Sequence, residues 1–173
     1  MILASDDLLE SEAIESTISF MKKNPQARYS YSMHRRIDEK GNFICERRGY
    51  PFSRRRLTNY NFVGHVQCFE KDLFEKLGGY DGSFYAEDYD FTLRASEILD
   101  DSQILQNPLF LHKYRIHGNN RSIEGLEESR QSITSSIKNS LKRREGIDVD
   151  VFWSHVTQDN YNYFDWRMRW NRL

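Results

Sequence analysis

Two periods of hydrophobic and polar positions alternate along this chain of 173 residues. Apolar residues spaced three or four apart are typical of amphipathic helices, whereas short aromatic and branched runs bounded by turn residues are typical of strands. Helices are predicted over residues 11–23, 71–77, 87–99 and 123–144. Strands are predicted over residues 28–37, 43–47, 62–69 and 104–116. This alternation of strands and helices predicts an α/β domain.

Local signals define several ends of these elements. Residues 2–4 resemble the end of a buried strand that runs into an acidic loop. In the first helix we expect Ser11 as N-cap, and an apolar stripe of Ala13, Ile14, Ile18 and Met21. The pair Gly78-Gly79 is expected to end the helix before it, because glycine adopts the left-handed conformation of a helix C-cap.

Composition favours a folded domain with a polar surface. Charged residues make up 29% of the chain, but 11 Phe, 10 Tyr and 3 Trp exceed what a disordered chain carries. The formal net charge of -1 predicts no polyanionic partner for the chain as a whole. Cys45 and Cys68 lack metal-ligand spacing and are interpreted as reduced thiols of a cytoplasmic protein. No apolar run is long enough to span a bilayer.

Asp6 and Asp7 form the first group of residues with chemical potential. Adjacent carboxylates in a loop can bind a divalent cation such as Mg²⁺ or Mn²⁺, which in turn can hold a diphosphate. The alternative is that they only cap the following helix. The sequence leaves both interpretations open.

A second acidic group, Glu87, Asp88 and Asp90, lies at the start of a predicted helix. All three carboxylates suit the positive end of the helix dipole, so a purely structural role is one interpretation. The other is that one of them is a general base that removes a proton from a hydroxyl nucleophile. The sequence does not decide which acid faces a substrate.

His117 follows a predicted strand, within a loop that continues as Gly118-Asn119-Asn120. Neutral imidazole is a common metal ligand, and Arg115 can pair with phosphate. A lone histidine is nevertheless more often structural.

Two basic segments have open interpretations. Arginines crowd residues 47–56 together with aromatic residues, which suits a solvated loop, a polyanionic sugar or nucleic acid. The segment 166–170 is aromatic and basic, and either packs on the domain or touches a membrane surface.

Three motifs in this order resemble the second half of a family 2 glycosyltransferase of the GT-A fold. They are ASDD at residues 4–7, GGYDGSFYAEDYDFTLR at 78–94 and YRIHGNNRS at 114–122. The resemblance extends over residues 1 to about 145. More narrowly, GYPFSRRRL at 49–57 and KNSLKRREGI at 138–147 are similar to bacterial chondroitin polymerase domains.

The resemblance implies a partial GT-A, Rossmann-like fold with a mixed sheet flanked by helices, lacking the N-terminal nucleotide-binding strands. Residues 1–147 are then the C-terminal portion of the catalytic domain, and residues 148–173 an aromatic, basic extension. It implies inverting, metal-dependent transfer of a sugar from a nucleotide-sugar donor, such as a UDP-sugar, to a glycan hydroxyl in bacterial surface polysaccharide synthesis. We expect this segment alone to be inactive. The alternative is a non-catalytic carbohydrate- or partner-binding module that retains the fold.

The resemblance also assigns roles to residues. Asp6, Asp7 and His117 would hold Mn²⁺ or Mg²⁺, and Asp88 would be the base that deprotonates the acceptor. Ala4 occupies the place of the first acid of a strict Asp-X-Asp motif, which is a departure from the pattern. The residues expected to contact substrate are Glu87, Arg115, Asn119 and Asn120. The parent protein is expected in the cytoplasm or peripherally at the inner face of the membrane, with no nucleic-acid partner.

Overall fold

The computed structural model describes residues 1, 3–59, 61–64, 66–120 and 125–146. Two compact units are present, residues 1–137 and 138–173, and the described part of the second consists mainly of the last turns of helix α6. The predicted boundary at residue 147 stays a prediction. The elements are β1 (Leu8–Leu9), α1 (Ala13–Lys23), β2 (Tyr29–Ile37), β3 (Phe43–Arg47), α2 (Arg54–Leu57), β4 (Gln67–Phe69), α3 (Lys71–Lys76), α4 (Glu87–Ile98), the 3₁₀ turn η1 (Asp101–Gln103), β5 (Ile104–Arg115) and α6 (Leu126–Glu145).

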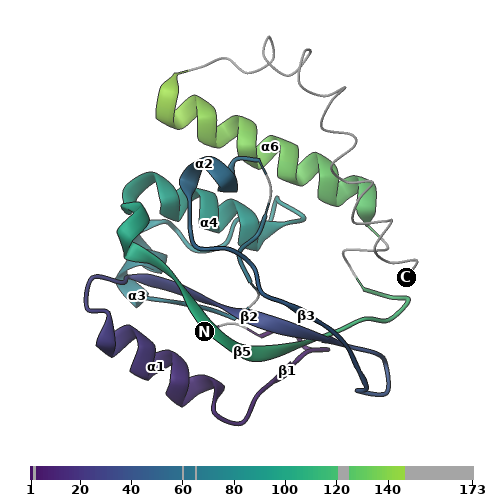
Figure 1. Cartoon of the computed structure of the whole chain (residues 1–173). Coiled ribbons are helices and arrows are strands. Elements are labelled where there is room, and N and C mark those ends of the chain that lie inside the picture. The colour runs from purple at the N-terminus through teal and green to yellow at the C-terminus, as the bar shows by residue number, and fades with distance from the viewer. Residues whose placement is uncertain (2, 60, 65, 121–124, 147–173) are drawn as a thin grey trace. The chain divides into compact units, whose positions relative to one another are not determined.

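Strand β2 forms the centre of a five-stranded mixed sheet (Figure 1). It is parallel to β5 on one side and antiparallel to β3 and β4 on the other, and β1 pairs antiparallel with β5. Because β2 and β5 are parallel, their carboxyl ends lie at the same edge of the sheet, next to the start of β1. The β2–β5 register shifts between Ser32 and His34, opposite the stretch of β5 that contains Pro108, a residue that cannot donate to the ladder.

An aromatic cluster fixes helix α4 against one face of this sheet. The rings of Phe69 on β4 and Phe91 on α4 have centroids 4.8 Å apart, and Phe91 is fully buried. The hydroxyls of Tyr29 on β2 and Thr92 on α4 are 2.9 Å apart. The first turn of α4, which carries the acidic motif, is thereby held in a defined position.

The double-glycine turn before α4 has the predicted conformation. Gly78 and Gly79 have φ values of 74° and 73°, in the left-handed region that favours glycine. Arg94 donates from Nη1 to Leu77 O at 2.6 Å and from Nη2 to Gly79 O at 2.9 Å. Its Nε donates to the buried Asp90 carboxylate at 2.7 Å, so one arginine joins the turn to the helix.

The predicted arrangement of the N-terminal residues was wrong. Leu3 and Ala4 are outside any strand, and the short strand β1 follows the acidic pair instead of preceding it. The N–H of Asp7 donates to Ala4 O, which turns the chain, and Leu8 then pairs with Lys113 of β5.

The predicted details of the first helix were also partly wrong. Ser11 is not the N-cap: it donates to Glu12, and α1 begins at Ala13. Ala13 and Thr17 are buried, whereas Ile14 and Ile18 are 58% and 45% exposed. Thr17 tolerates burial because its hydroxyl donates to Ala13 O at 2.7 Å.

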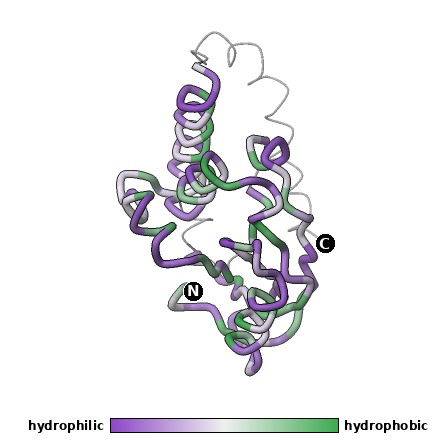
Figure 2. Tube along the Cα trace, turned by 90° about the vertical axis from the view of Figure 1, so that its left-hand side faces the viewer, coloured by the Kyte–Doolittle hydropathy of each residue, from purple (hydrophilic) through white to green (hydrophobic). Residues whose placement is uncertain are grey.

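The strand predicted over residues 62–69 is shorter in the structure, where only Gln67–Phe69 is extended into the sheet. The other predicted elements are present within a few residues of their expected ends. Hydrophobic and hydrophilic residues alternate along the chain (Figure 2), and none of the described helices is long and apolar enough to cross a membrane.

Candidate active site

The structure brings Asp6 and His117 together at the edge of the sheet where β5 ends. Asp6 Oδ2 and His117 Nε2 are 2.8 Å apart, although 111 residues separate the two in sequence. The antiparallel pairing of β1 with β5 makes this approach possible, because it places the residues just before β1 next to the residues just after β5. The Asp6 side chain is 37% exposed and that of His117 is 22% exposed, so both remain accessible to a ligand.

Asn120 organises the loop that carries His117. Its Oδ1 accepts from the N–H of His117 at 2.7 Å, and its Nδ2 donates to Arg115 O at 3.0 Å and to Asp6 Oδ2 at 3.4 Å. Asn120 is 2% exposed, whereas Asn119 is exposed. The contacts of Asn120 are therefore with the protein, although both asparagines were expected to contact substrate.

Arg115 connects this loop to the hairpin turn between β2 and β3. Its Nε donates to the backbone oxygen of Asp6 at 2.9 Å, and its Nη1 donates to Glu39 O at 2.8 Å and Asp38 O at 3.3 Å. These contacts hold the backbone of Asp6 in place. The prediction that Arg115 pairs with phosphate is not tested, but three of its described hydrogen bonds go to backbone oxygens.

Asp7 lies in a different environment from Asp6. Its Oδ2 is 2.8 Å from His112 Nε2, and its Oδ1 accepts from the N–H of Arg115 at 2.8 Å. The side chains of Asp7 and His112 are 0% and 1% exposed. His112 was not among the expected site residues, since nothing in its sequence neighbours indicates Asp7 as a partner. Only the β1–β5 register reveals it.

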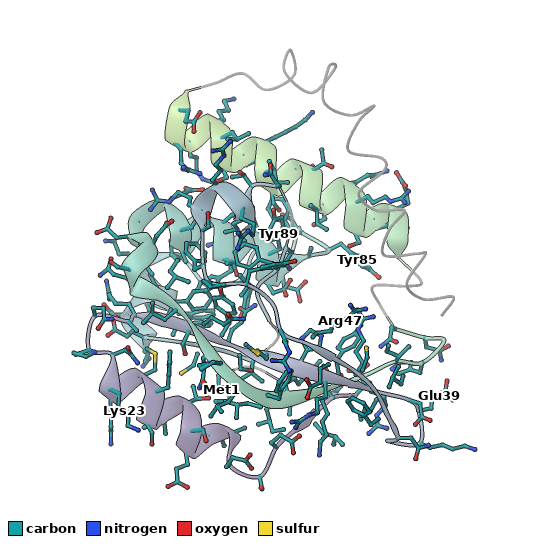
Figure 3. All side chains as sticks on the ribbon, in the orientation of Figure 1. Met1, Lys23, Glu39, Arg47, Tyr85 and Tyr89 are labelled. Atoms are coloured by element: carbon teal, nitrogen blue, oxygen red, sulfur yellow. The ribbon has the colours of Figure 1, made fainter. Side chains whose placement is uncertain are left out.

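The second acidic group is divided in the same way. Asp90 is buried and paired with Arg94, while Glu87 and Asp88 are half-buried at the start of α4. Asp88 Oδ1 accepts from the N–H of Tyr89 at 2.8 Å. In Figure 3 the labelled Tyr85 and Tyr89 mark the beginning of this helix.

These contacts determine the electrostatics around Asp6 and around Asp88. The hydrogen bond with His117 lowers the pKa of Asp6, and the charge of Arg115 acts in the same direction. Burial raises the pKa of Tyr80, and the nearby charges of Asp88 and Glu87 raise it further. Asp6 is therefore ionised at neutral pH, as a metal ligand must be.

Asp6 and His117 offer a divalent cation two side-chain ligands. One carboxylate and one imidazole are suitable ligands for Mn²⁺, and a metal that also binds a substrate diphosphate needs few protein ligands. Within the described residues there is no group of three or more His, Cys, Asp or Glu side chains arranged to hold a metal. The site therefore suits a metal shared with a substrate better than an all-protein cage.

Comparisons with known proteins identify homologous sequences. The chain is 30% identical over 143 residues to a chondroitin synthase of Escherichia coli, which covers 82% of this chain and 20% of that protein. It is 27% identical over 165 residues to a chondroitin synthase and to a hyaluronan synthase of Pasteurella multocida, each match covering 94% of this chain and 16% of the relative. The chain thus spans about a fifth or less of the length of these relatives. No protein-family model matches it.

A solved structure supports the fold. The crystal structure of S. aureus TarS 1-349 superposes with a TM-score of 0.56 at 11% identity, covering 86% of this chain and 42% of that one. At this identity the likeness concerns the fold alone, and it confirms the predicted partial GT-A arrangement of a mixed sheet flanked by helices. The sequence matches confirm the predicted resemblance: the chain is similar to one segment of the chondroitin and hyaluronan synthases, as expected from its likeness to family 2 glycosyltransferases.

Proposed function

We propose that this chain is part of a glycosyltransferase that transfers a sugar from a nucleotide-sugar donor to a hydroxyl of a glycan acceptor, in bacterial polysaccharide synthesis. The observation that carries the proposal is the distance of 2.8 Å between Asp6 Oδ2 and His117 Nε2, at the edge of a sheet of the GT-A type. Both lie in motifs that resemble this family. The names of the relatives support the class of reaction.

In this proposal Asp6 and His117 hold Mn²⁺ or Mg²⁺. When bound, the metal supplies a Lewis acid that neutralises the negative charge of the departing nucleoside diphosphate. Two residues of the chain hold these ligands in position: Arg115 fixes the backbone of Asp6, and Asn120 fixes the backbone of His117. Asp7 is expected to have a supporting role through its contact with His112. Both of its carboxylate oxygens already have protein partners.

Asp88 is the base of the proposed reaction. It would accept the proton of the acceptor hydroxyl as that oxygen forms its bond to the anomeric carbon and the bond to the diphosphate breaks, with inversion at that carbon. Asp90 is unsuited to this role because it is buried and ion-paired with Arg94. Glu87 is placed one residue earlier in the same turn and is proposed to contact the acceptor.

Binding provides the direct test, since the chain spans only part of its relatives. We expect Mn²⁺ to raise the affinity of the chain for UDP, measured by isothermal titration calorimetry. Asp6→Asn and His117→Ala should each reduce this metal-dependent gain by about tenfold or more, the loss expected on disturbing a metal site. Asp72→Asn is a matched control, because the Asp72 side chain is 71% exposed on α3 and pairs with Arg28, away from the residues that hold Asp6 and His117.

The alternative function is a non-catalytic module that binds carbohydrate or a protein partner. The direct hydrogen bond between Asp6 and His117 favours it to the extent that two such groups satisfy each other without a metal. In that case UDP binding would be absent or indifferent to Mn²⁺, while glycan binding would remain. The same titration therefore separates the two functions.

A further inference from the structure

Helix α1 carries a row of apolar side chains that the rest of the chain leaves exposed. Ile14 is 58% exposed and Ile18 is 45% exposed. Met21, which is half-buried, continues the row, and the exposed Pro25 follows just beyond the end of the helix. Residues three or four apart lie on one side of a helix, so these side chains form one surface. Contiguous exposed apolar surface indicates an interaction site, whereas isolated exposed residues do not.

Other exposed apolar residues do not form such a row in the part of the chain that the structure describes. Phe43 and Ile44 are consecutive on β3, so their side chains point to opposite faces of the sheet. Ile98, at the end of α4, is exposed by itself on that helix. The row is therefore particular to α1 among the described helices.

The row lies beside the buried side of α1. Ala13 and Thr17 are the buried residues of this helix, which packs against β5. Successive residues are about 100° apart around a helix, so Ile14 and Ile18 lie roughly a quarter turn from the buried pair. Figure 1 shows α1 on the face of the sheet opposite α4, and Figure 3 marks its end at Lys23. The row is thus available to a second molecule while α1 stays packed on the sheet.

Opposite charges flank the two ends of this row. Glu15 lies in the first turn of α1 and Lys22 in the last turn, and both are exposed. Neither forms an ion pair with another described residue. They are seven residues apart, about two turns, and therefore lie along the same side of the row. The helix dipole accounts for the signs of these charges, but it does not account for the exposed apolar residues between them.

A second copy of α1 complements this surface when the two helices pair antiparallel about a two-fold axis. With Ile18 against Met21 of the other copy, the opposite directions of the helices place Ile14 against Pro25 of the other copy. Each contact then occurs twice by symmetry. In the same register Glu15 lies beside Lys22 of the other copy, so the rim of the apolar contact carries complementary charges. A parallel pair would instead place Glu15 beside Glu15 and Lys22 beside Lys22.

We propose that the surface formed by Ile14, Ile18 and Met21 is an interface with a second copy of this chain, paired in the antiparallel register. Three turns of helix bury far less than the roughly 1,600 Å² of a standard interface, so the dimer is weak and reversible. Burial of apolar surface supplies its affinity, and the pairing of Glu15 with Lys22 determines its direction. None of the residues of the proposed active site takes part, so the dimer does not depend on the proposed function.

Sedimentation velocity of the whole chain measures this association directly. We expect the weight-average sedimentation coefficient to rise from monomer toward dimer as the chain concentration increases from about 10 to 1,000 μM, a range suited to small interfaces. EDTA should leave this rise unchanged, because no proposed metal ligand is in the interface. A chain that stays monomeric over the whole range overturns the proposal. Binding of that monomer to phosphatidylcholine vesicles through Ile18 would assign the row to a lipid surface instead.

Substitution of Ile18 tests the apolar contact. Ile18→Asp should weaken dimerisation by about tenfold or more, because each dimer would have to withdraw two carboxylates from water. Ser19→Asp is the matched control, since it adds the same charge at the next exposed position, away from the row, and should change the affinity less than about twofold. Both residues are exposed, so urea unfolding at low concentration should show an intact fold. Equal weakening by the two variants overturns the proposal.

Reversal of the flanking charges tests the register. Glu15→Lys and Lys22→Glu should each weaken dimerisation by about fivefold, because each places two pairs of like charges together. The double variant restores opposite charges and should return the affinity to within about twofold of the wild type. A role in the helix dipole alone predicts the opposite, with the double variant the most impaired. The proposal is overturned if the double variant fails to restore the dimer.

Discussion

Replacement of Arg94 by alanine tests how the acidic motif at the start of α4 is divided between structure and chemistry. Arg94 and Asp90 form an ion pair four residues apart, with side chains 16% and 2% exposed. Arg94→Ala would leave the buried Asp90 carboxylate without a partner. It would also remove the donors to Leu77 O and Gly79 O, which hold the double-glycine turn.

The size of the effect follows from this burial. Removal of one partner from a buried ion pair costs about 3–5 kcal/mol, because the remaining charge is left uncompensated. A domain of this kind is stable by about 5–15 kcal/mol, so Arg94→Ala should remove a large part of its free energy of unfolding. Asp90→Asn should cost less, about 1–3 kcal/mol, because the amide oxygen can still accept from Arg94.

Urea unfolding followed by far-UV circular dichroism measures both changes. The control is Lys71→Ala, since Lys71 and Glu75 have the same four-residue spacing on a helix but are 88% and 62% exposed. We expect no measurable change from this control. The reasoning is refuted if Arg94→Ala costs less than about 1 kcal/mol, because a buried unpaired carboxylate is worth more than that. In that case Asp90 would again be a candidate for the general base, together with Asp88.

Three further predictions concern the two motifs. His117→Ala should raise the pKa of Asp6 toward its ordinary value of 3.8, as measured by NMR titration of the carboxyl carbon. In the wild type, the contribution of this hydrogen bond to the free energy of unfolding is complete above the ordinary pKa, and it is lost as the pH falls through the lowered pKa. Asn120→Ala should reduce the free energy of unfolding by about 2–3 kcal/mol in thermal denaturation, because the side-chain hydrogen bonds to His117, Asp6 and Arg115 are lost. Gly78→Ala and Gly79→Ala should each cost about 1–2 kcal/mol through left-handed strain, and Gly79→Ala should cost more in urea unfolding, since its new Cβ would lie 3.0 Å from a phenylalanine ring of α3.

Local patterns in the sequence were sufficient to predict most of the elements. The hairpin turn before Phe43, the double-glycine turn and helix α4 each depend on residues close together in the chain. The same information failed for α1, where Ile14 and Ile18 suggested the buried face. Which face of a short helix is buried depends on the surface against which it packs, and that surface is formed by residues distant in sequence.

The candidate site was predicted only in part, for the same reason. Asp6 and His117 were both expected in it, and the structure joins them. The partnership of Asp7 with His112 was not foreseen, because it depends on the antiparallel register of β1 with β5. A two-residue strand carries too little periodicity to predict its partner or its register.

Each of the two acidic motifs contains one buried, paired acid and one more exposed acid, an arrangement that neither interpretation of the sequence anticipated. In each motif one acid is buried against a basic side chain, Asp7 against His112 and Asp90 against Arg94. Its near neighbour, Asp6 or Asp88, is more exposed and lies at the end of a strand pair or the first turn of a helix. The buried pair anchors the backbone from which the exposed acid projects.

This division explains why an acidic cluster can be both structural and chemical. A carboxylate that must meet a metal or remove a proton needs a fixed position, but it cannot commit both of its oxygens to protein donors. The described contacts of Asp6 engage its Oδ2, and those of Asp88 engage its Oδ1. A second acid nearby can supply the fixed position instead. Substitution of Asp7 or Asp90 should therefore disturb stability first and ligand binding only as a consequence. Substitution of Asp6 or Asp88 should change binding or chemistry while the chain stays folded, and this contrast distinguishes the two kinds of acid in each motif.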